Sequence, residues 1–345
     1  MYIYKTQILL QYYIHIFKKL SFNKLLNMAK LFVSFHLSKI FKKPILYGLP
    51  TSISFEPTTS CNLRCTQCPS GLRSFTRPIG MLNETVFKNQ INQFKKHLFS
   101  IVFYFQGEPF LNPDFLKMVK YANSINLYTI TSTNAHYINE QVSNEIVNSG
   151  LNKLIISIDG TTQQTYENYR VGGNLIKVLE GTKQIVLAKK RLKAKHLWIV
   201  WQFVVFKNNE HQIKDVQKLA LEYGVDELTI KTAQIYDFEN AHDLVPQNQK
   251  YARYILKNGK YQIKNKLLNQ CWRMWIACVI TWDGKIVPCC FDKDAKYQVG
   301  NLLNSNFKTI WKSEPYIKFR QQILKSRSEI DICKNCTEGT KVWAD

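Results

Sequence analysis

From Pro50 onward, short apolar segments alternate with amphipathic helical segments, and this order limits the fold more than any other feature of the chain. The predicted strands cover residues 52–56, 101–105, 128–131, 154–158, 197–205 and 227–231. The predicted helices cover residues 83–98, 114–125, 139–149, 175–190 and 212–223, with Asn83 and Asn139 as N-caps and Gly150 and Gly224 as stop signals. Repeated strand–helix units form parallel sheets, so we predict an α/β fold with a partial (β/α)6 TIM-like barrel.

Polar motifs follow the first four predicted strands. A cysteine-rich loop follows the first, Gln106-Gly107-Glu108-Pro109 the second, and the segments 131–134 and 157–160 close the third and fourth. Active sites of such barrels lie at the carboxyl ends of the strands. All four motifs are therefore expected on one rim of the barrel.

The cysteine-rich loop carries Cys61, Cys65 and Cys68 in the spacing C-x3-C-x2-C. Three thiolates are one fewer than a closed four-ligand site needs. They fit a [4Fe–4S] cluster with one iron open to a small molecule, because iron–sulfur clusters take cysteine ligands. The alternative is a zinc site completed by a cysteine or histidine elsewhere in the chain.

The cysteine loop and the strand-end motifs together resemble the radical SAM enzyme superfamily, whose cluster binds S-adenosylmethionine (SAM). The family's Gly-Gly-Glu-Pro segment corresponds to Gln106-Gly107-Glu108-Pro109, with Gln in place of the first Gly. The resemblance assigns the SAM ammonium to Glu108 and the SAM carboxylate to Arg170. It also assigns SAM contacts to Ser132, Asn134 and Ser157. Asp159 is expected to cap a helix or form a turn, and Gln67 stands where the family usually has an aromatic residue.

A second group of cysteines lies near the end of the chain. It resembles the SPASM/twitch extension of the same enzymes, through Gly284-x4-Cys289 and the closing pair Cys333 and Cys336. The resemblance implies one auxiliary [4Fe–4S] cluster held by Cys271, Cys289, Cys333 and Cys336. Cys278 and Cys290 are interpreted as free buried cysteines, although either could replace one of the four ligands. A zinc ribbon is the alternative for this region.

Residues 1–50 carry eight lysines and no Asp, Glu or Arg, within a chain of 345 residues and net charge +22. Their apolar and lysine residues alternate as in amphipathic helices. Such helices either pack on the catalytic domain or contact anionic lipid as a basic interfacial segment. Translation could also start at Met28. We predict three regions: an N-terminal extension (1–50), a radical SAM core (51–260) and an auxiliary-cluster domain (261–345).

Clustered cysteines in a large chain indicate metal sites and a reducing, cytoplasmic location, with the membrane's inner face as an alternative. No helix-turn-helix, RRM or zinc-finger pattern is present, so nucleic acid is not expected as a partner.

The resemblance implies reductive cleavage of SAM to a 5′-deoxyadenosyl radical, which takes hydrogen from the substrate. A flavodoxin or ferredoxin is the implied electron donor. One auxiliary cluster favours an oxidoreductase acting on a sugar, an aminocyclitol or a cell-envelope glycan precursor. The alternatives are a peptide or protein maturase and, from another class, a non-catalytic zinc- and nucleic-acid-binding protein. Candidate substrate contacts are Gln202, Lys231, Gln234 and Asp292.

Overall fold

A nine-stranded sheet forms the centre of the computed structural model, which describes residues 6–336, the side chains of residues 6–9 and 11 excepted. Residues 1–5 of the predicted region 1–50 and residues 337–345 of the predicted region 261–345 lie outside the described residues. The sheet has the order β11-β10-β9-β1-β2-β3-β4-β5-β6. The six strands that come first in the chain run parallel to one another. They are β1 (Ser52–Phe55), β2 (Ser100–Val102), β3 (Tyr128–Thr133), β4 (Lys153–Ser157), β5 (Trp198–Val205) and β6 (Glu227–Thr232). The predicted partial barrel is confirmed.

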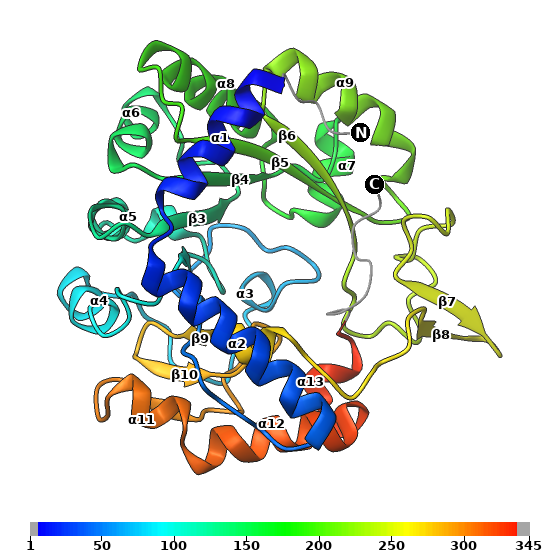
Figure 1. The fold of residues 1–345 in the computed structure, drawn as a ribbon. Coiled ribbons are helices and arrows are strands. Elements are labelled where there is room, and N and C mark those ends of the chain that lie inside the picture. The colour runs from blue at the N-terminus through cyan, green and yellow to red at the C-terminus, as the bar shows by residue number, and fades with distance from the viewer. Residues whose placement is uncertain (1–5, 337–345) are drawn as a thin grey trace.

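Helices cover the outside of the curved sheet (Figure 1). They are α4 (Glu84–Ile91), α5 (Phe115–Ser124), α6 (Glu140–Ser149), α8 (Leu175–Arg191) and α9 (Ile213–Tyr223), with the shorter α3 (Pro69–Leu72) and α7 (Gln163–Tyr169) near the cysteine loop. Asn83 accepts hydrogen bonds from Thr85 N and Val86 N, and Asn139 accepts one from Val142 N, so both N-caps are confirmed. Helix α4 ends at Ile91, earlier than predicted, because turns replace its last residues.

The C-terminal part of the chain extends the same sheet. Strand β9 (Ala277–Ile280) lies parallel to β1, and the antiparallel strands β10 (Lys285–Val287) and β11 (Gly300–Asn301) follow. The sequence did not predict this seventh parallel strand. The remaining elements are β7 (Tyr254–Lys257), β8 (Lys260–Ile263), α10 (Arg273–Ile276), α11 (Phe307–Trp311), α12 (Glu314–Ser326) and α13 (Asp331–Lys334), with 3-10 turns at Pro109–Leu111, Glu210–Gln212 and Arg327–Glu329.

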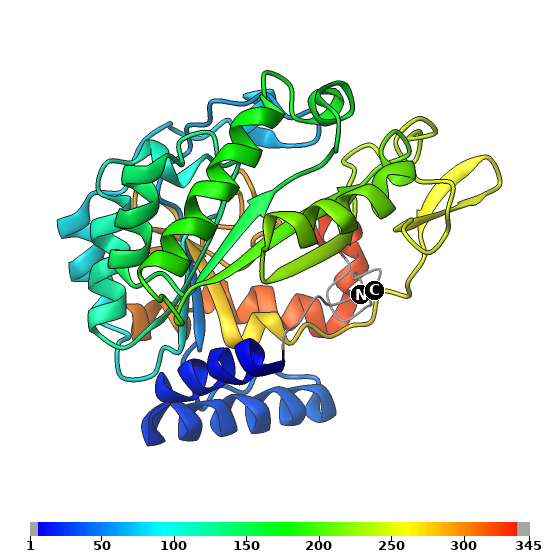
Figure 2. The ribbon, with the colours of Figure 1, turned by 90° about the horizontal axis from the view of Figure 1, so that it is seen from above.

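Two N-terminal helices, α1 (Thr6–Lys18) and α2 (Phe22–Phe41), follow one another at an angle across the amino ends of the barrel strands (Figures 1 and 2). Tyr12 stacks on Trp198, the first residue of β5, with ring centroids 4.3 Å apart. Lys24 Nζ donates to Asn126 O at 2.7 Å. The prediction of helices is confirmed, and they pack on the barrel. No helix among the described residues has the length and apolar character needed to cross a bilayer.

Candidate active site

The strand ends of the barrel surround a cavity of about 360 Å³. This volume falls in the range of pockets that hold cofactors and small substrates. All of the predicted SAM contacts line it, together with the three cysteines of the first loop: Gln106, Gly107, Glu108, Ser132, Asn134, Ser157, Arg170, Cys61, Cys65 and Cys68. The prediction that the motifs share one rim is confirmed by this arrangement.

The cysteine loop is held between the barrel and two neighbouring segments. Arg64 N donates to Val171 O at 2.9 Å, and Thr66 N donates to Tyr169 O at 3.2 Å. A Cβ added to Gly71 in α3 would come within 2.4 Å of Cys65 N. Helix α3 can therefore approach the loop only because this position lacks a side chain.

The cysteines do not form a site for a single ion. No three His, Cys, Asp or Glu side chains within residues 6–336 are grouped as one metal ion would require. A cubane cluster makes a different demand, because each thiolate binds its own iron atom. Three cysteines that line one cavity are the number that a [4Fe–4S] cluster needs when one of its irons stays open.

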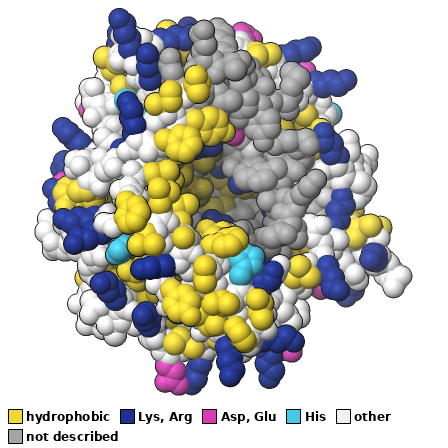
Figure 3. Space-filling model, viewed as in Figure 1, with side chains coloured by type: hydrophobic (Ala, Val, Ile, Leu, Met, Phe, Trp, Pro, Cys, Tyr) yellow, Lys and Arg dark blue, Asp and Glu magenta, His cyan; other side chains and the backbone are white. Residues whose placement is uncertain are grey.

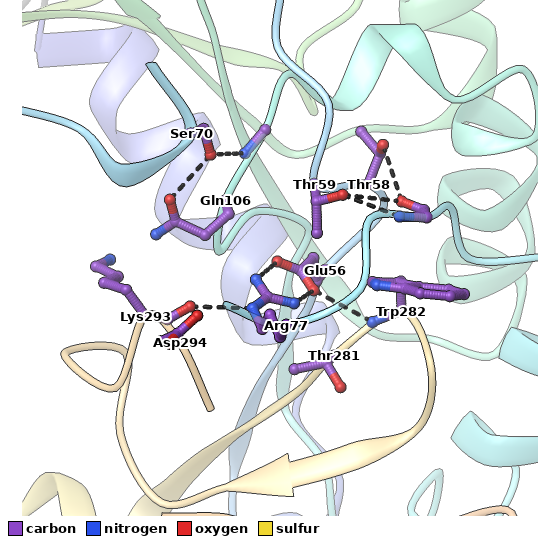
Figure 4. A network of polar contacts seen from close by, with 12 residues as sticks. Glu56, Thr58, Thr59, Ser70, Arg77, Gln106, Thr281, Trp282, Lys293 and Asp294 are labelled. Carbon is purple, nitrogen blue, oxygen red and sulfur yellow. Dashed lines mark hydrogen bonds and ion pairs between the residues drawn. The ribbon is translucent and has the colours of Figure 1, made fainter. Parts of the chain in front are cut away.

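Gln106 and Gly107 bind the segment that follows the cysteines. Ser70 Oγ donates to Gln106 Oε1 at 3.0 Å and accepts from Gly107 N at 2.9 Å (Figure 4). Gly107 has φ +73°, and a Cβ there would lie 2.3 Å from Thr58 O, so only glycine fits without strain. The glutamine that replaces the family's first glycine thus has a local role, since it anchors the start of α3.

Glu108 presents a buried carboxylate to the cavity. One oxygen accepts from Thr133 Oγ1 at 2.7 Å, and the other accepts from Asn134 N at 2.8 Å. Burial raises the pKa of Glu108 to about 7, although these hydrogen bonds oppose the shift. A cation bound beside this group would favour its charged form, which suits the predicted contact with an ammonium.

Three further polar side chains face the same space. Asn134 Nδ2 donates to Asn62 Oδ1 at 2.8 Å, which links the end of β3 to the cysteine loop. Ser132 and Ser157 line the cavity from the ends of β3 and β4. These positions can offer hydroxyl and amide groups to a bound cofactor.

Arg170 reaches the cysteine loop from the residue after α7. Its Nη1 lies 3.8 Å from Cys65 Sγ, and its Nε donates to Asp159 Oδ2 at 2.6 Å. The expectation for Asp159 is wrong: Thr162 caps α7, whereas the fully buried Asp159 pairs with Arg170 and accepts from Val204 N at 2.7 Å. Asp159 therefore positions Arg170, and the carboxylate raises the pKa of Arg170.

The far wall of the cavity is basic. Lys231, Arg253 and Lys293 line it, whereas Glu108 is the only acidic residue among the cavity-lining residues. Arg253 Nη1 is buried and has no hydrogen-bond partner among the described residues. Burial and the nearby Arg253 charge lower the pKa of Lys231 to about 8. This wall can bind an anionic group.

Gln202 and Gln234 also line the cavity, but Asp292 does not. Asp292 accepts from Lys296 N and Tyr297 N at 2.8 Å each, so its carboxylate closes a turn. The expectation that Asp292 contacts substrate is wrong. Tyr236 was not predicted: its backbone N donates to Gln67 Oε1 at 3.3 Å, and its ring lines the cavity next to the glutamine that replaces an aromatic residue.

The second cysteine group is buried around Arg327. The Nη2 atom of Arg327 donates to Cys336 Sγ at 3.2 Å, and the charges of Cys271, Cys333 and Cys336 raise the pKa of Arg327. Cys289 lies beside Cys271, and all four cysteines are less than a tenth exposed. Four buried thiols, three of them close to one guanidinium, fit an anionic cluster, since the cation offsets part of its charge.

The two remaining cysteines differ in their surroundings. Cys278 on β9 is buried beside Arg320 and Tyr316, and burial raises the pKa of its thiol. The hydrogen bond from its neighbour Cys289 and, to a smaller extent, the positive charges of Arg273 and Lys293 lower the pKa of Cys290. Cys278 thus has the surroundings of a neutral core thiol, whereas Cys290 lies among cationic side chains.

A buried ion pair joins the two halves of the site. Arg77 Nη1 donates to Glu56 Oε2 at 2.7 Å, and Arg77 Nε donates to Lys293 O at 3.1 Å (Figure 4). Trp282 N donates to the same Glu56 oxygen at 3.4 Å. This network connects the end of β1 with the segment that carries the second cysteine group.

The comparisons with known proteins agree with this site. The radical SAM superfamily model matches residues 55–220, and the iron–sulfur cluster-binding SPASM model matches residues 271–337. The mycofactocin maturase MftC of Mycobacterium ulcerans is 24% identical over 313 residues, which cover 83% of this chain and 80% of that protein.

Two solved structures share the fold. SuiB of Streptococcus suis, bound to the precursor peptide SuiA, has a TM-score of 0.61 at 15% identity and covers 89% of this chain and 74% of that one. BtrN, in complex with SAM and 2-DOIA, has a TM-score of 0.53 at 18% identity, and the match covers 86% of this chain and 98% of that one.

This chain belongs to the radical SAM enzyme superfamily and carries a SPASM domain. It is an enzyme whose cofactors are [4Fe–4S] clusters and SAM.

Proposed function

We propose that this enzyme oxidises a hydroxyl-bearing carbon of an anionic sugar, aminocyclitol or cell-envelope glycan precursor. When bound, a reduced cluster and SAM together supply a one-electron route for removing hydrogen from an unreactive carbon. The basic wall of the cavity carries the proposal. Lys231, Arg253 and Lys293 face a space with a single acidic residue, Glu108, which the SAM ammonium would neutralise.

Each group of residues has a proposed task. Cys61, Cys65 and Cys68 hold the SAM-binding cluster, and Cys271, Cys289, Cys333 and Cys336 hold the auxiliary cluster. Glu108 binds the SAM ammonium, and Arg170, fixed by Asp159, binds the SAM carboxylate. The hydroxyl and amide groups of Ser132, Asn134 and Ser157 orient the rest of SAM. The cavity keeps water from the reacting carbon and holds it in place, which is how an enclosed site contributes to the rate.

A peptide substrate is the second candidate, because MftC is by name a maturase and the SuiB structure holds a precursor peptide. Maturases of this type often carry a separate N-terminal peptide-binding domain with a small sheet. Residues 6–50 form two helices, and we place the small substrate first on the basic wall of the cavity alone.

An acidic electron donor, a flavodoxin or ferredoxin, fits the net charge of +22. We place the reaction in the cytoplasm, and the nine free cysteines support a reducing compartment.

The test is anaerobic reconstitution with iron and sulfide, followed by an assay of 5′-deoxyadenosine formation from SAM. About eight irons per chain support two cubane clusters. Sugar phosphates and nucleotide sugars should yield an oxidised product. The same sugars without the phosphate or nucleotide group, which are neutral, should not. Arg253→Met should raise KM for the anionic substrate at least about tenfold, the loss expected for one charge-assisted hydrogen bond. Oxidation of neutral sugars alone, or modification of a peptide alone, would contradict the proposal.

A further inference from the structure

Helix α2 is amphipathic, but it turns its polar face toward the protein and its apolar face outward. Its buried residues are mostly polar: Lys24, Asn27, Leu31, Ser34, Phe35 and Ser38. A helix on a globular protein normally turns its apolar stripe to the core. Here the polar stripe faces the protein.

Specific hydrogen bonds hold this polar face against residues 45–49, which follow the helix, and through Lys24 against the loop before β3. Lys24 Nζ donates to Lys19 O at 2.9 Å and to Asn126 O at 2.7 Å. The Asn27 side chain pairs with both backbone groups of Leu49, at 2.7 and 2.9 Å. Ser34 Oγ accepts from Tyr47 N, and Ser38 Oγ accepts from Ile45 N. These hydrogen bonds therefore fix which face of α2 is turned toward the protein.

Most of the large apolar side chains described on the two N-terminal helices are exposed (Figure 3). Phe22, Leu25, Phe32, Val33 and Ile40 recur at helical spacing on α2, and Phe22 is 77% and Ile40 70% exposed. On α1 the exposed apolar residues are Leu10, Tyr13, Ile14 and Phe17. A contiguous apolar surface of this kind marks an interaction site.

Within the two helices and the turn after them, the charged side chains that the structure describes are all lysines. The exposed lysines of the two helices and the turn after them are Lys18, Lys30, Lys39, Lys42 and Lys43. Residues 1–50 contain no acidic residue that could balance them. Long lysine side chains can extend past an apolar face to reach phosphate groups at a lipid–water boundary.

We propose that α1 and α2 form a docking surface for an anionic membrane, with their apolar residues among the lipid headgroups. A second copy of this chain fits the same surface poorly, because it would bring two sets of lysines together without any acidic partner. The membrane would lie against the amino ends of the strands. The cavity at the carboxyl ends would then open away from the lipid, toward the aqueous phase.

The test is flotation of the reconstituted holoenzyme with vesicles of phosphatidylcholine alone or of equal parts phosphatidylcholine and phosphatidylglycerol. We expect binding to the anionic vesicles and at least about tenfold less binding to the neutral ones, with a decrease at high salt. Phe32→Ser with Ile40→Ser, and separately Lys30→Glu with Lys39→Glu, should each lower binding at least about tenfold.

The matched controls change exposed residues of α8: Ile176→Ser with Leu187→Ser, and Lys177→Glu with Lys183→Glu. These variants should bind the vesicles like the original protein. Equal binding to both kinds of vesicle, or an equal loss in control and α2 variants, would overturn the proposal. Sedimentation that shows self-association through α2 without vesicle binding would also overturn it, in favour of a second copy. SAM cleavage in solution should be unchanged in all four variants, which separates this test from that of the proposed function.

Discussion

The Glu108 carboxyl group titrates near neutrality because it is buried, so we expect SAM binding to depend on pH. Burial raises the pKa of Glu108 to about 7 in the protein without SAM. The ammonium of SAM is attracted to the charged form only, which is present above that pKa and lost below it. SAM affinity should therefore rise between pH 6 and pH 8, as measured by equilibrium binding to the anaerobic enzyme.

Glu108→Gln should remove this dependence. The amide keeps the size of the side chain but loses the charge, and we expect SAM affinity to fall about tenfold to a hundredfold at pH 8. The iron content should stay the same, which distinguishes a lost SAM contact from a lost cluster. An unchanged pH profile in the variant would mean that another group titrates.

The residues that could be predicted from the sequence are those within short motifs. Cys61, Glu108 and Arg170 were identified because their neighbours in the chain carry the same signal. The role of Asp159 could not be predicted, because its partners Arg170 and Val204 meet it only in the folded barrel. Tyr236 and Arg253 lie after the last barrel strand, in a segment without a motif.

At the scale of elements, the buried pair of Glu56 and Arg77 joins β1 to the C-terminal strands. Removing one partner leaves an unpaired buried charge, so Arg77→Ala should lower the free energy of unfolding by about 3–5 kcal/mol. The double change Glu56→Gln with Arg77→Met removes both charges and should cost less. Urea denaturation under anaerobic conditions measures both effects.

The matched control is Arg191→Ala, which removes an exposed pair with Glu140 whose side chains are 54% and 66% accessible. Surface pairs contribute little, so this change should cost less than about 1 kcal/mol. Similar losses for Arg77→Ala and Arg191→Ala would show that the Glu56–Arg77 pair is not structurally important.

Elements were predictable where one pattern repeats. The six strand–helix units share the same alternation, and four of the five predicted helices form within one residue of their expected bounds, whereas α4 ends seven residues early. Strand β9 has only four residues, Ala277–Ile280, and follows a short helix. Its pairing with β1, more than two hundred residues earlier, depends on tertiary contacts that no local pattern carries.

For the whole molecule, the net charge of +22 should govern encounters with a protein electron donor. An acidic flavodoxin is attracted over a distance set by ionic strength, so added salt should slow the reduction of the clusters. Stopped-flow absorbance measures this rate. Reduction by dithionite at the same salt concentrations controls for effects on the clusters themselves, and a rate with flavodoxin that salt does not change would contradict the expectation.

The barrel and the C-terminal region share one sheet, so we expect the barrel not to fold without the strands that follow it. In the complete chain β1 lies between β2 and β9, and its residues Ile53 and Phe55 are fully buried. A chain cut after residue 264 would leave β1 as an unprotected edge with an apolar face, which is a template for aggregation. A chain cut after residue 336 keeps every described strand and serves as the control. Size-exclusion chromatography should show aggregates for the shorter chain and a defined species for the longer one. A soluble short chain that unfolds cooperatively would show instead that the barrel is stable without β9.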